Sequence, residues 1–306
     1  MKQTQNSPAA IAPLVLPSVV KSLVRGRAKE YIREGICSVV DAHDRLRGLS
    51  GDLVPPCRLR VRVGCFLSFV RVQQYRAVAA EFLKHMGVLV DLQSTMNFLD
   101  IGCGCGQIAS ALADMPGFRG RYEGIDPDIE AIEWCRTHVT ASFPAFQFKH
   151  SDIANAQYNP GGTLQAERFS FPYESASADV ILLKSVFTHL RLKPLTQYLR
   201  EIRRLLQPGG TCIATFYLLN EEAHRLMGQG KSRFAFPYED EGCRVADRIT
   251  PEYLVAYEEE DVRELARQAG LQIRGDIQFG SWCGRENFLS FQDVVAFEAA
   301  CDLGNG

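Results

Sequence analysis

Residues 98–106, Phe-Leu-Asp-Ile-Gly-Cys-Gly-Cys-Gly, place an acid and three alternating glycines directly after an apolar run. Glycine lets a backbone turn sharply and lets a ligand approach it closely, so Asp100 and the glycines predict a strand end that meets a small molecule. A dinucleotide-binding loop needs the spacing G-x-G-x-x-G, which Gln107 breaks. The spacing therefore favours the amino-acid end of a ligand over a pyrophosphate, and it weakens the hypothesis of a nicotinamide-dependent oxidoreductase.

Two further strand ends carry acids. The run Tyr-Glu-Gly-Ile-Asp ends at Asp126, 20 residues beyond Gly106, where a carboxylate can accept both ribose hydroxyls of a nucleoside. The next apolar run ends in His-Ser-Asp-Ile, in which Asp152 offers an acceptor for an adenine amino group and Ile153 an apolar side chain for its face. Three strand ends with three polar anchors predict a ligand that contains a nucleoside.

Strand and helix patterns alternate along the middle of the chain. The predicted strands are 97–101, 122–125, 145–149, 179–183 and 212–216, and the predicted helices are 73–87, 107–115, 129–137 and 195–206. Such alternation predicts right-handed crossovers and a parallel sheet with helices on both faces, whose ligand site lies at the carboxyl ends of the strands. A further helix at 258–269 and two strands at 271–279 and 291–299, joined by a glycine-rich turn, predict an antiparallel closing hairpin.

Other segments do not fit this repeat. Apolar residues at helical spacing over 19–49 predict a helical extension that Pro55-Pro56 ends, and 59–63 alternates like a short strand. The segments 154–170 and 218–250 look like long loops, which in compact domains are usually lids or binding loops. We therefore expect an N-terminal extension over 1–54 and a domain over 55–306 with a substrate-covering insert at about 218–250.

From about Pro55 to Ala299 the chain resembles the class I S-adenosylmethionine-dependent methyltransferase family. The motifs that carry the resemblance are Leu99–Gly106, Gly124–Pro127, Ser151–Ile153 and Leu205–Gly210. The resemblance implies a Rossmann-like three-layer α/β sandwich with a seven-stranded, mostly parallel sheet and a C-terminal antiparallel hairpin. It also implies S-adenosylmethionine as cofactor and S-adenosylhomocysteine as product. More narrowly, Ser-Val-Phe-Thr-His-Leu at 185–190 is similar to a bacterial small-molecule subgroup.

The resemblance assigns cofactor contacts residue by residue. Residues that would line the methionine and ribose portions are Asp100, Gly102, Cys103, Gly104 and Gly106. The ribose would be held by Asp126 with Pro127, and the adenine by Asp152 with Ile153. The side chains beside the methionine end would be Lys184 and Ser185.

His189 is the candidate catalytic base. Methyl transfer is an in-line displacement, so the enzyme mainly orients the acceptor, and a base is needed only if the acceptor must lose a proton. His189 follows the fourth predicted strand, and histidine titrates near neutral pH. The alternative is that His189 caps a helix or packs under the cofactor.

Three arginines could bind acidic groups of the ligands. Arg285, in the predicted hairpin turn, could clamp an acceptor carboxylate, but a surface charge or an internal ion pair is the favoured interpretation. Arg60 and Arg62 could reach the cofactor carboxylate, with the same alternative.

Charge argues against a nucleic-acid acceptor. The formal net charge is -2, and no run of five or more Lys or Arg could neutralise phosphates. A nucleic-acid amino methyltransferase would also carry an N/D-P-P-Y/F turn where this chain has Lys-Ser-Val-Phe at 184–187. The sequence therefore favours a hydroxyl of a small molecule or a sugar-bearing acceptor, with an inert or regulatory cofactor-binding module as the alternative.

Cysteine usage and hydropathy indicate a cytoplasmic protein. The ten cysteines form no C-x-x-C pair, which favours a reduced chain without a zinc site. No run reaches the roughly 20 apolar residues of a membrane-spanning helix. The apolar stretch at 9–20 is broken by Pro13 and Pro17, so we expect neither a signal peptide nor a membrane span.

Overall fold

The structure is a computed structural model that describes residues 27–64, 70–156 and 158–300. It divides into two compact units, Met1–Ala77 and Val78–Gly306. The predicted domain boundary after residue 54 stays a prediction. Within the described residues, no helix combines the length and the apolar character that crossing a membrane requires.

The first unit contains α2 (Arg27–Leu46), α3 (Cys57–Arg60) and the start of α5 (Val72–Leu89). The helical extension predicted over 19–49 is thus found as α2, and residues 19–26 lie outside the described part. Helix α3 contacts α2, and the Cys57 amide at the start of α3 donates to Asp41 Oδ1 of α2 at 2.8 Å.

The short strand predicted at 59–63 is wrong. Residues 57–60 form the single helical turn α3, and a hydrogen-bonded turn follows. An alternating strand would place arginine on the solvent face, but Arg60 is buried and donates to Asp44 Oδ2 at 2.9 Å and to the carbonyls of Pro55 and Val70. This ion pair supports the structural interpretation of Arg60.

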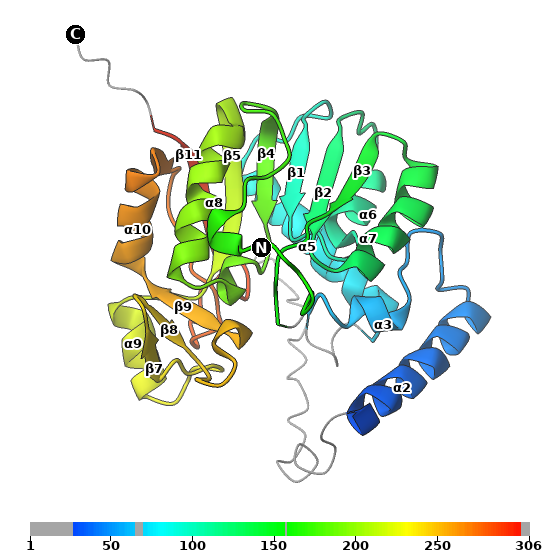
Figure 1. Ribbon diagram of the computed structural model, residues 1–306, viewed down its shortest axis with the longest axis horizontal. Helices are drawn as coiled ribbons and strands as arrows, with labels where there is room; N and C mark the ends of the chain where they lie inside the picture. The colour runs from blue at the N-terminus through cyan, green and yellow to red at the C-terminus, as the bar shows by residue number, and fades with distance from the viewer. Residues whose placement is uncertain (1–26, 65–69, 157, 301–306) are drawn as a thin grey trace, which may run out of the picture. The chain divides into compact units, whose positions relative to one another are not determined.

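A seven-stranded sheet forms the centre of the second unit, with the order β10-β11-β5-β4-β1-β2-β3 (Figure 1). Its strands are β1 (Phe98–Ile101), β2 (Tyr122–Asp126), β3 (Phe146–His150), β4 (Ala178–Leu183), β5 (Leu206–Phe216), β10 (Leu271–Ile273) and β11 (Asp293–Ala299). Strands β1 to β5 pair in parallel, whereas β11 is antiparallel to both β5 and β10. The predicted sheet and its closing antiparallel strand are confirmed, although β10 is shorter than 271–279.

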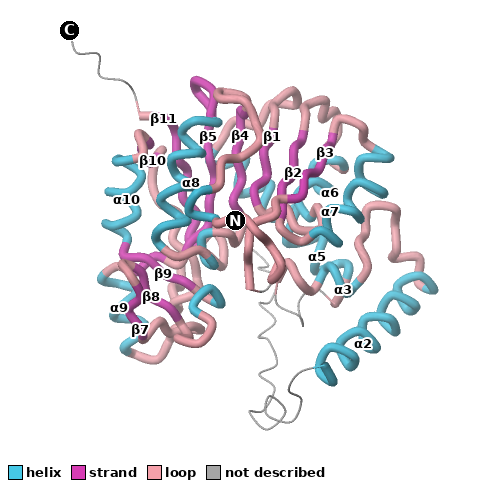
Figure 2. The backbone as a smooth tube through the Cα atoms, viewed as in Figure 1, coloured by secondary structure: helices cyan, strands magenta, loops and turns pink. Residues whose placement is uncertain are grey.

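Helices cover both faces of this sheet. They are α6 (Gln107–Ala113), α7 (Ile129–Cys135) with the π-helical turn η1 (Arg136–Thr140), α8 (Leu192–Leu205) and α10 (Glu259–Gln268). The strand order runs outward from β1 to β3 on one side and from β4 to β5 on the other, so right-handed crossovers place α6 and α7 opposite α8. Figure 2 shows α8 in front of the sheet. The direction of the strand order therefore switches between β1 and β4, which is where ligands bind in such folds.

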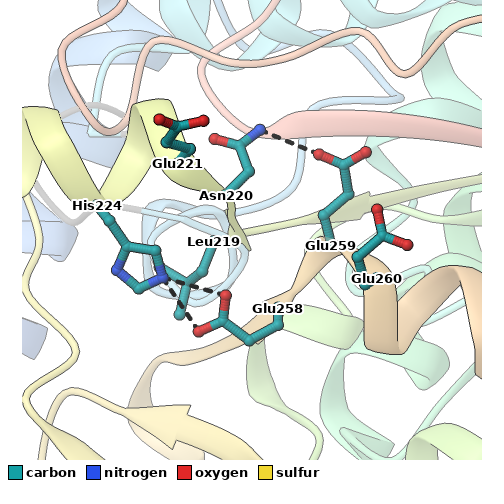
Figure 3. A pocket seen from close by; sticks show the side chains of 7 residues that line it. All are labelled: Leu219, Asn220, Glu221, His224, Glu258, Glu259 and Glu260. Carbon is teal, nitrogen blue, oxygen red and sulfur yellow. Dashed lines mark hydrogen bonds and ion pairs between the residues drawn. The ribbon is translucent and has the colours of Figure 1, made fainter.

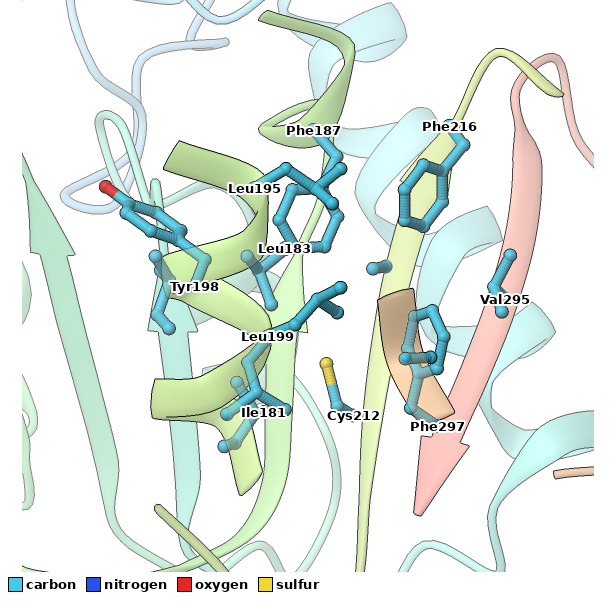
Figure 4. Close-up of a cluster of buried hydrophobic side chains, with 14 of the residues drawn as sticks. Ile181, Leu183, Phe187, Leu195, Tyr198, Leu199, Cys212, Phe216, Val295 and Phe297 are labelled. Carbon is cyan, nitrogen blue, oxygen red and sulfur yellow. The ribbon is translucent and has the colours of Figure 1, made fainter. Parts of the chain in front are cut away.

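The α8 face buries the main hydrophobic core. Leu195, Leu199 and Ile202 recur at helical spacing and are fully buried against Ile181 and Leu183 of β4 (Figure 4). Each such side chain contributes about 1.5–3 kcal/mol when it leaves water. This packing fixes β4 and the residues that follow it, including the turn η3 (Phe187–His189).

The segment predicted as a long loop at 218–250 is structured. It contains β6 (Leu218–Leu219), α9 (Glu221–Gly228), β7 (Tyr238–Asp240) and β8 (Cys243–Val245), and η4 (Pro251–Tyr253) and β9 (Val255–Glu258) follow. These strands form a second sheet with the order β6-β9-β8-β7. We call residues 218–258 the insert. Phe236 and Leu226 of the insert pack in one hydrophobic cluster with Trp282, which follows β10, so the insert is not an open loop.

The segment predicted as irregular at 154–170 is a compact loop. It contains one helical turn, η2 (Ala166–Arg168), and an isolated bridge joins Ile153 to Leu164.

Candidate functional site

The glycine-rich loop leaves β1 at Ile101 and turns into α6. Gly102 and Gly104 have φ of 80° and 52°, in the left-handed region that favours glycine. A Cβ atom at Gly102 would lie 2.4 Å from Cγ2 of Val186, which follows β4. The loop thus needs glycine to pass close to the end of the neighbouring strand, and the amides of Gly102 and Cys103 donate to the Ile125 carbonyl of β2.

Asp126 holds this loop from the end of β2. Its Oδ2 accepts from the Gly104 amide at 2.8 Å, and its Oδ1 accepts from the Asp128 amide at 2.8 Å. Asp128 in turn caps α7 by accepting from the amides of Glu130 and Ala131. Burial raises the pKa of Asp126 to about 7, although these backbone hydrogen bonds oppose the shift. Each carboxylate oxygen keeps a second lone pair, which a ribose hydroxyl could use.

Asp100 is buried near the end of β1, where the charge of Lys184 acts on it. It accepts a hydrogen bond from the Tyr122 hydroxyl. Burial raises the pKa of Asp100 to about 6, and the Tyr122 hydrogen bond and the charge of Lys184 oppose the shift. Lys184 donates to Gln107 Oε1 at 3.1 Å, so the ends of β1 and β4 and the start of α6 are linked. No sequence pattern indicates Tyr122 as the partner of Asp100, because the two residues lie on different strands.

Asp152 stabilises the loop that follows β3 through hydrogen bonds. Its carboxylate accepts from the Thr163 hydroxyl and amide and from Asn159 Nδ2, and these hydrogen bonds lower its pKa. Ile153 is buried in the main core. Nearby, His150 Nε2 lies 3.1 Å from the Pro127 carbonyl. The adenine role of Asp152 and Ile153 therefore stays a prediction, and Asp152 has a structural role in closing this loop.

The residues after β4 and β5 meet at the same edge of the sheet. Ser185 has a φ of 59°, which is unusual for a residue with a side chain. Its amide donates to Thr215 Oγ1 at 2.7 Å, and its hydroxyl donates to Gln292 Oε1 at 2.9 Å. Gln292 Nε2 donates to the Tyr217 hydroxyl at 3.3 Å. Sequence reasoning found Ser185 and missed Thr215, Gln292 and Tyr217, since more than 100 residues separate Ser185 from Gln292.

His189 ends the turn η3 and contacts η4 of the insert. Its Nδ1 lies 3.0 Å from the Glu252 carbonyl oxygen. A carbonyl oxygen only accepts, so Nδ1 carries the proton of the neutral ring and Nε2 remains the acceptor nitrogen. Burial lowers the pKa of His189 from 6.5, although hydrogen bonds to the carbonyls of Glu252 and Tyr253 oppose the shift. The imidazole is therefore neutral at pH 7, as a base must be.

Arg285 forms an internal ion pair, which confirms the favoured interpretation. Its guanidinium is buried and lies 2.9 Å from Glu222 Oε2, 2.9 Å from Asn220 Oδ1 and 3.3 Å from Asp293 Oδ1. It joins the insert to the start of β11 and is not free to clamp a ligand.

Asp293 is the centre of that junction. Its fully buried carboxylate also accepts from the amides of Leu218 and Gly280, both at 2.6 Å, and from Trp282 Nε1 at 2.7 Å. Burial raises its pKa to about 6, against these hydrogen bonds.

An open cavity of about 280 Å³ lies at the outer side of the insert (Figure 3). The residues that line it are Leu219, Asn220, Glu221, His224, Glu258, Glu259 and Glu260. His224 Nε2 lies 3.1 Å from both carboxylate oxygens of Glu258. The cavity is beside α9 and the start of α10, whereas the glycine-rich loop follows β1 on the other side of β4 and β5 (Figure 1). No group of three or more potential metal ligands is arranged to hold an ion in the part of the chain that the structure describes.

Comparison with known families decides what this edge of the sheet does. Residues 99–214, from β1 to β5, match the family described as a methyltransferase domain. The chain therefore carries a segment of the methyltransferase domain family between β1 and β5. The cofactor that this family implies is S-adenosylmethionine.

One solved structure shows the same fold. The chain is similar to the PH0226 protein of Pyrococcus horikoshii OT3, at 17% identity and a TM-score of 0.53 over 78% of this chain and 97% of that chain. A S-adenosylmethionine-dependent methyltransferase of Methanosarcina mazei is 21% identical, with a TM-score of 0.48 over 71% of this chain and 97% of that one. The CcbJ methyltransferase of Streptomyces caelestis is 17% identical, with a TM-score of 0.48 over 72% of this chain and 89% of that one.

Cofactor affinity should depend on pH through Asp126. Its pKa of about 7 in the ligand-free protein means that the carboxyl group must lose a proton before it can accept two ribose hydroxyls. We expect the affinity for S-adenosylhomocysteine to fall by about 30-fold between pH 8 and pH 5.5, because each pH unit below the pKa costs tenfold. Isothermal titration calorimetry at stepped pH measures this change.

The raised pKa of Asp126 also determines how the stability of the protein changes with pH. The folded ligand-free protein binds the Asp126 proton more tightly than the unfolded chain, so this group lowers stability as pH rises from about 4 to about 7. Bound cofactor reverses the preference, since its hydroxyls favour the carboxylate. An affinity that stays constant from pH 5.5 to 8 would show that Asp126 does not bind the ribose as an ion.

Proposed function

We propose that the enzyme methylates a hydroxyl group of a small molecule or a glycan-type acceptor, and that His189 is the base. The observation that carries the proposal is the neutral His189 imidazole, which the Glu252 carbonyl orients through Nδ1. Its Nε2 can accept the hydroxyl proton while the acceptor oxygen forms its bond to the methyl carbon. When bound, S-adenosylmethionine supplies a methyl group whose bonding electrons leave with the sulfur.

The cofactor pocket in this proposal uses the polar strand ends. Asp126 accepts the ribose hydroxyls, while Asp100, beside Lys184, faces the ammonium and carboxylate end of the methionine part. The left-handed backbone at Gly102 and Gly104 fits a ligand that lies against the loop. Asp152 and Ile153 border the adenine, with Cys103, Gly106, Pro127 and Ser185 completing the pocket.

Charge and the insert support a small acceptor. A formal net charge of -2 provides no general attraction for a phosphate backbone. The insert, which includes the predicted cover at 218–250, holds His189 through Glu252 of η4. A cover that also positions the base would exclude water from the reaction and would leave room for a limited acceptor.

Methyl-labelled cofactor tests the proposal. Purified enzyme is incubated with S-adenosylmethionine, labelled on the methyl group, and a fractionated cell extract. We expect label in the small-molecule or glycan fraction, in a product that resists alkaline hydrolysis as a methyl ether does. Label confined to nucleic acid or protein would refute the acceptor class. Tight binding of S-adenosylhomocysteine without labelled product in any fraction would instead support a regulatory cofactor-binding module.

A further inference from the structure

Three polar side chains from separate strand ends form one hydrogen-bonded chain at the carboxyl edge of the sheet. Ser185 follows β4, Tyr217 follows β5, and Gln292 precedes β11. The Ser185 hydroxyl donates to Gln292 Oε1 at 2.9 Å, and Gln292 Nε2 donates to the Tyr217 oxygen at 3.3 Å. Ser185 and Gln292 belong to none of the hydrophobic clusters that the described residues form, whereas the Tyr217 ring belongs to the cluster that contains Trp282.

The backbone at Ser185 is strained to place its side chain in this chain. Its φ of 59° lies in the left-handed region, and the amide donates to Thr215 Oγ1 at 2.7 Å to hold that conformation. Strained residues of this kind concentrate where a side chain must point at a ligand. The strain favours a functional role for the hydrogen-bonded chain over a purely structural one.

The direction of the hydrogen bonds leaves one donor unused. Ser185 donates to Gln292, and Gln292 donates to Tyr217, so the Tyr217 oxygen accepts. Among the residues that the structure describes, nothing accepts the Tyr217 hydroxyl hydrogen. Burial raises the pKa of Tyr217 to about 12, so the hydroxyl keeps its hydrogen at every pH of interest. Tyr217 is therefore a permanent donor that lacks a partner.

Aromatic rings extend from this donor towards solvent. The Tyr217 ring packs on Trp282 at a centroid distance of 5.4 Å and on Phe234 at 5.5 Å. Phe234 in turn contacts Phe291 at 5.9 Å, and Phe291 is 38% exposed. Tyr217 and Trp282 are buried, so the exposed Phe291 marks the outer end of this row of rings. Aromatic rings beside a hydroxyl donor suit the face of a ring-shaped acceptor.

We propose that Tyr217 donates a hydrogen bond to a second oxygen of the acceptor, adjacent to the hydroxyl that is methylated. Gln292 and Ser185 are the positioning residues that orient Tyr217. A hydrogen bond to the attacking oxygen itself would withhold the lone pair that forms the new bond, so the neighbouring oxygen is the partner. The acceptor is then a ring with two adjacent oxygens. This inference rests on the proposed hydroxyl methylation.

The first variant removes only the donor. With labelled S-adenosylmethionine and the acceptor fraction isolated from the extract, we expect Tyr217→Phe to raise the half-saturating acceptor concentration by about tenfold or more, the usual effect of one lost hydrogen bond. The maximal rate should stay within about threefold, and the affinity for S-adenosylhomocysteine should not change, because the ring and its packing remain. Tyr238→Phe, on β7 of the insert, is the matched control and should match the wild type.

The second variant keeps the contacts of residue 292 with Ser185 and Tyr217 but makes Tyr217 the donor in the second contact. In Gln292→Glu at pH 8, a carboxylate of the same size accepts from both hydroxyls and takes the hydrogen that Tyr217 otherwise offers the acceptor. We expect the same rise in half-saturating concentration as for Tyr217→Phe, with no further rise in the double variant. A rise in the double variant beyond that of Tyr217→Phe would show that Gln292 does not act through Tyr217.

The outcomes separate this inference from the function that it rests on. Labelled product with wild-type saturation in Tyr217→Phe would overturn the role of Tyr217 and leave hydroxyl methylation standing. A labelled product that lacks an oxygen next to the new methyl group would do the same. No labelled product from the wild-type enzyme would overturn both.

Discussion

Replacing Asp126 with alanine is expected to weaken S-adenosylhomocysteine binding by about 100-fold. The wild-type carboxylate would accept two ribose hydroxyls, and hydrogen bonds to a charged group are worth about 1.5–3 kcal/mol each. The substitution also releases the amides of Gly104 and Asp128, which the two carboxylate oxygens hold at 2.8 Å. Titration calorimetry at pH 8 measures the loss, with the melting temperature as a check on folding.

Two further variants test whether the lost affinity comes from the Asp126 carboxylate. Asp126→Asn keeps the size but turns an amide NH₂ group towards one of the two backbone donors, so we expect a loss at least half as large on a logarithmic scale. Asp276→Ala removes an exposed carboxylate between β10 and β11 and should leave the affinity unchanged. Wild-type affinity in Asp126→Ala would show that the ribose lies elsewhere.

Replacing His189 with alanine is expected to slow methyl transfer by about 100-fold or more, the usual scale for the loss of a general base. Cofactor affinity should stay within a few-fold, because the imidazole contacts the insert through Glu252 and not the glycine-rich loop. Single-turnover rates with saturating labelled cofactor measure the chemical step directly. In the wild-type enzyme the rate should be constant above pH 6.5 and should fall at lower pH, since burial lowers the pKa of His189.

His224→Ala is the matched control for this prediction. His224 lies in the insert, is exposed and pairs with Glu258, so its loss should leave the rate unchanged. If His224→Ala slowed the reaction and His189→Ala did not, the base would be on the other side of the insert. Equal rates in both variants would mean that the acceptor needs no base.

Local patterns were sufficient to predict the sheet. The strands β1 and β4 are short apolar runs, and the spacing of the glycines after Ile101 predicts the turn into α6. The carboxyl ends of parallel strands meet at one edge, so Asp100 and Asp126 could be brought together without coordinates. The hydrogen bond from Gly104 to Asp126 agrees with that expectation.

Tertiary contacts decide what the patterns missed. The alternation at 59–63 predicted a strand, but burial of Arg60 against Asp44 stabilises a helical turn instead. The insert looked like a loop because its strands are only two to four residues long and pair across the sequence. Gln292 and Tyr217 carry no motif, since their position beside Ser185 depends on the register of β11 against β5. Such pairings between distant segments leave no periodic signal in a single sequence.

The carboxylate of Asp293 limits how acceptor specificity can be engineered in this enzyme. Exchanging residues 218–258 for the corresponding segment of another methyltransferase would remove the Glu222 carboxylate and the Asn220 amide oxygen from the network around Asp293 and Arg285. A buried charge that loses a partner typically costs 3–5 kcal/mol, a large fraction of the stability of a domain. In a chimeric enzyme, the transplanted segment must therefore come with the residues of its own parent that correspond to Asp293, Arg285 and the turn at Gly280–Trp282.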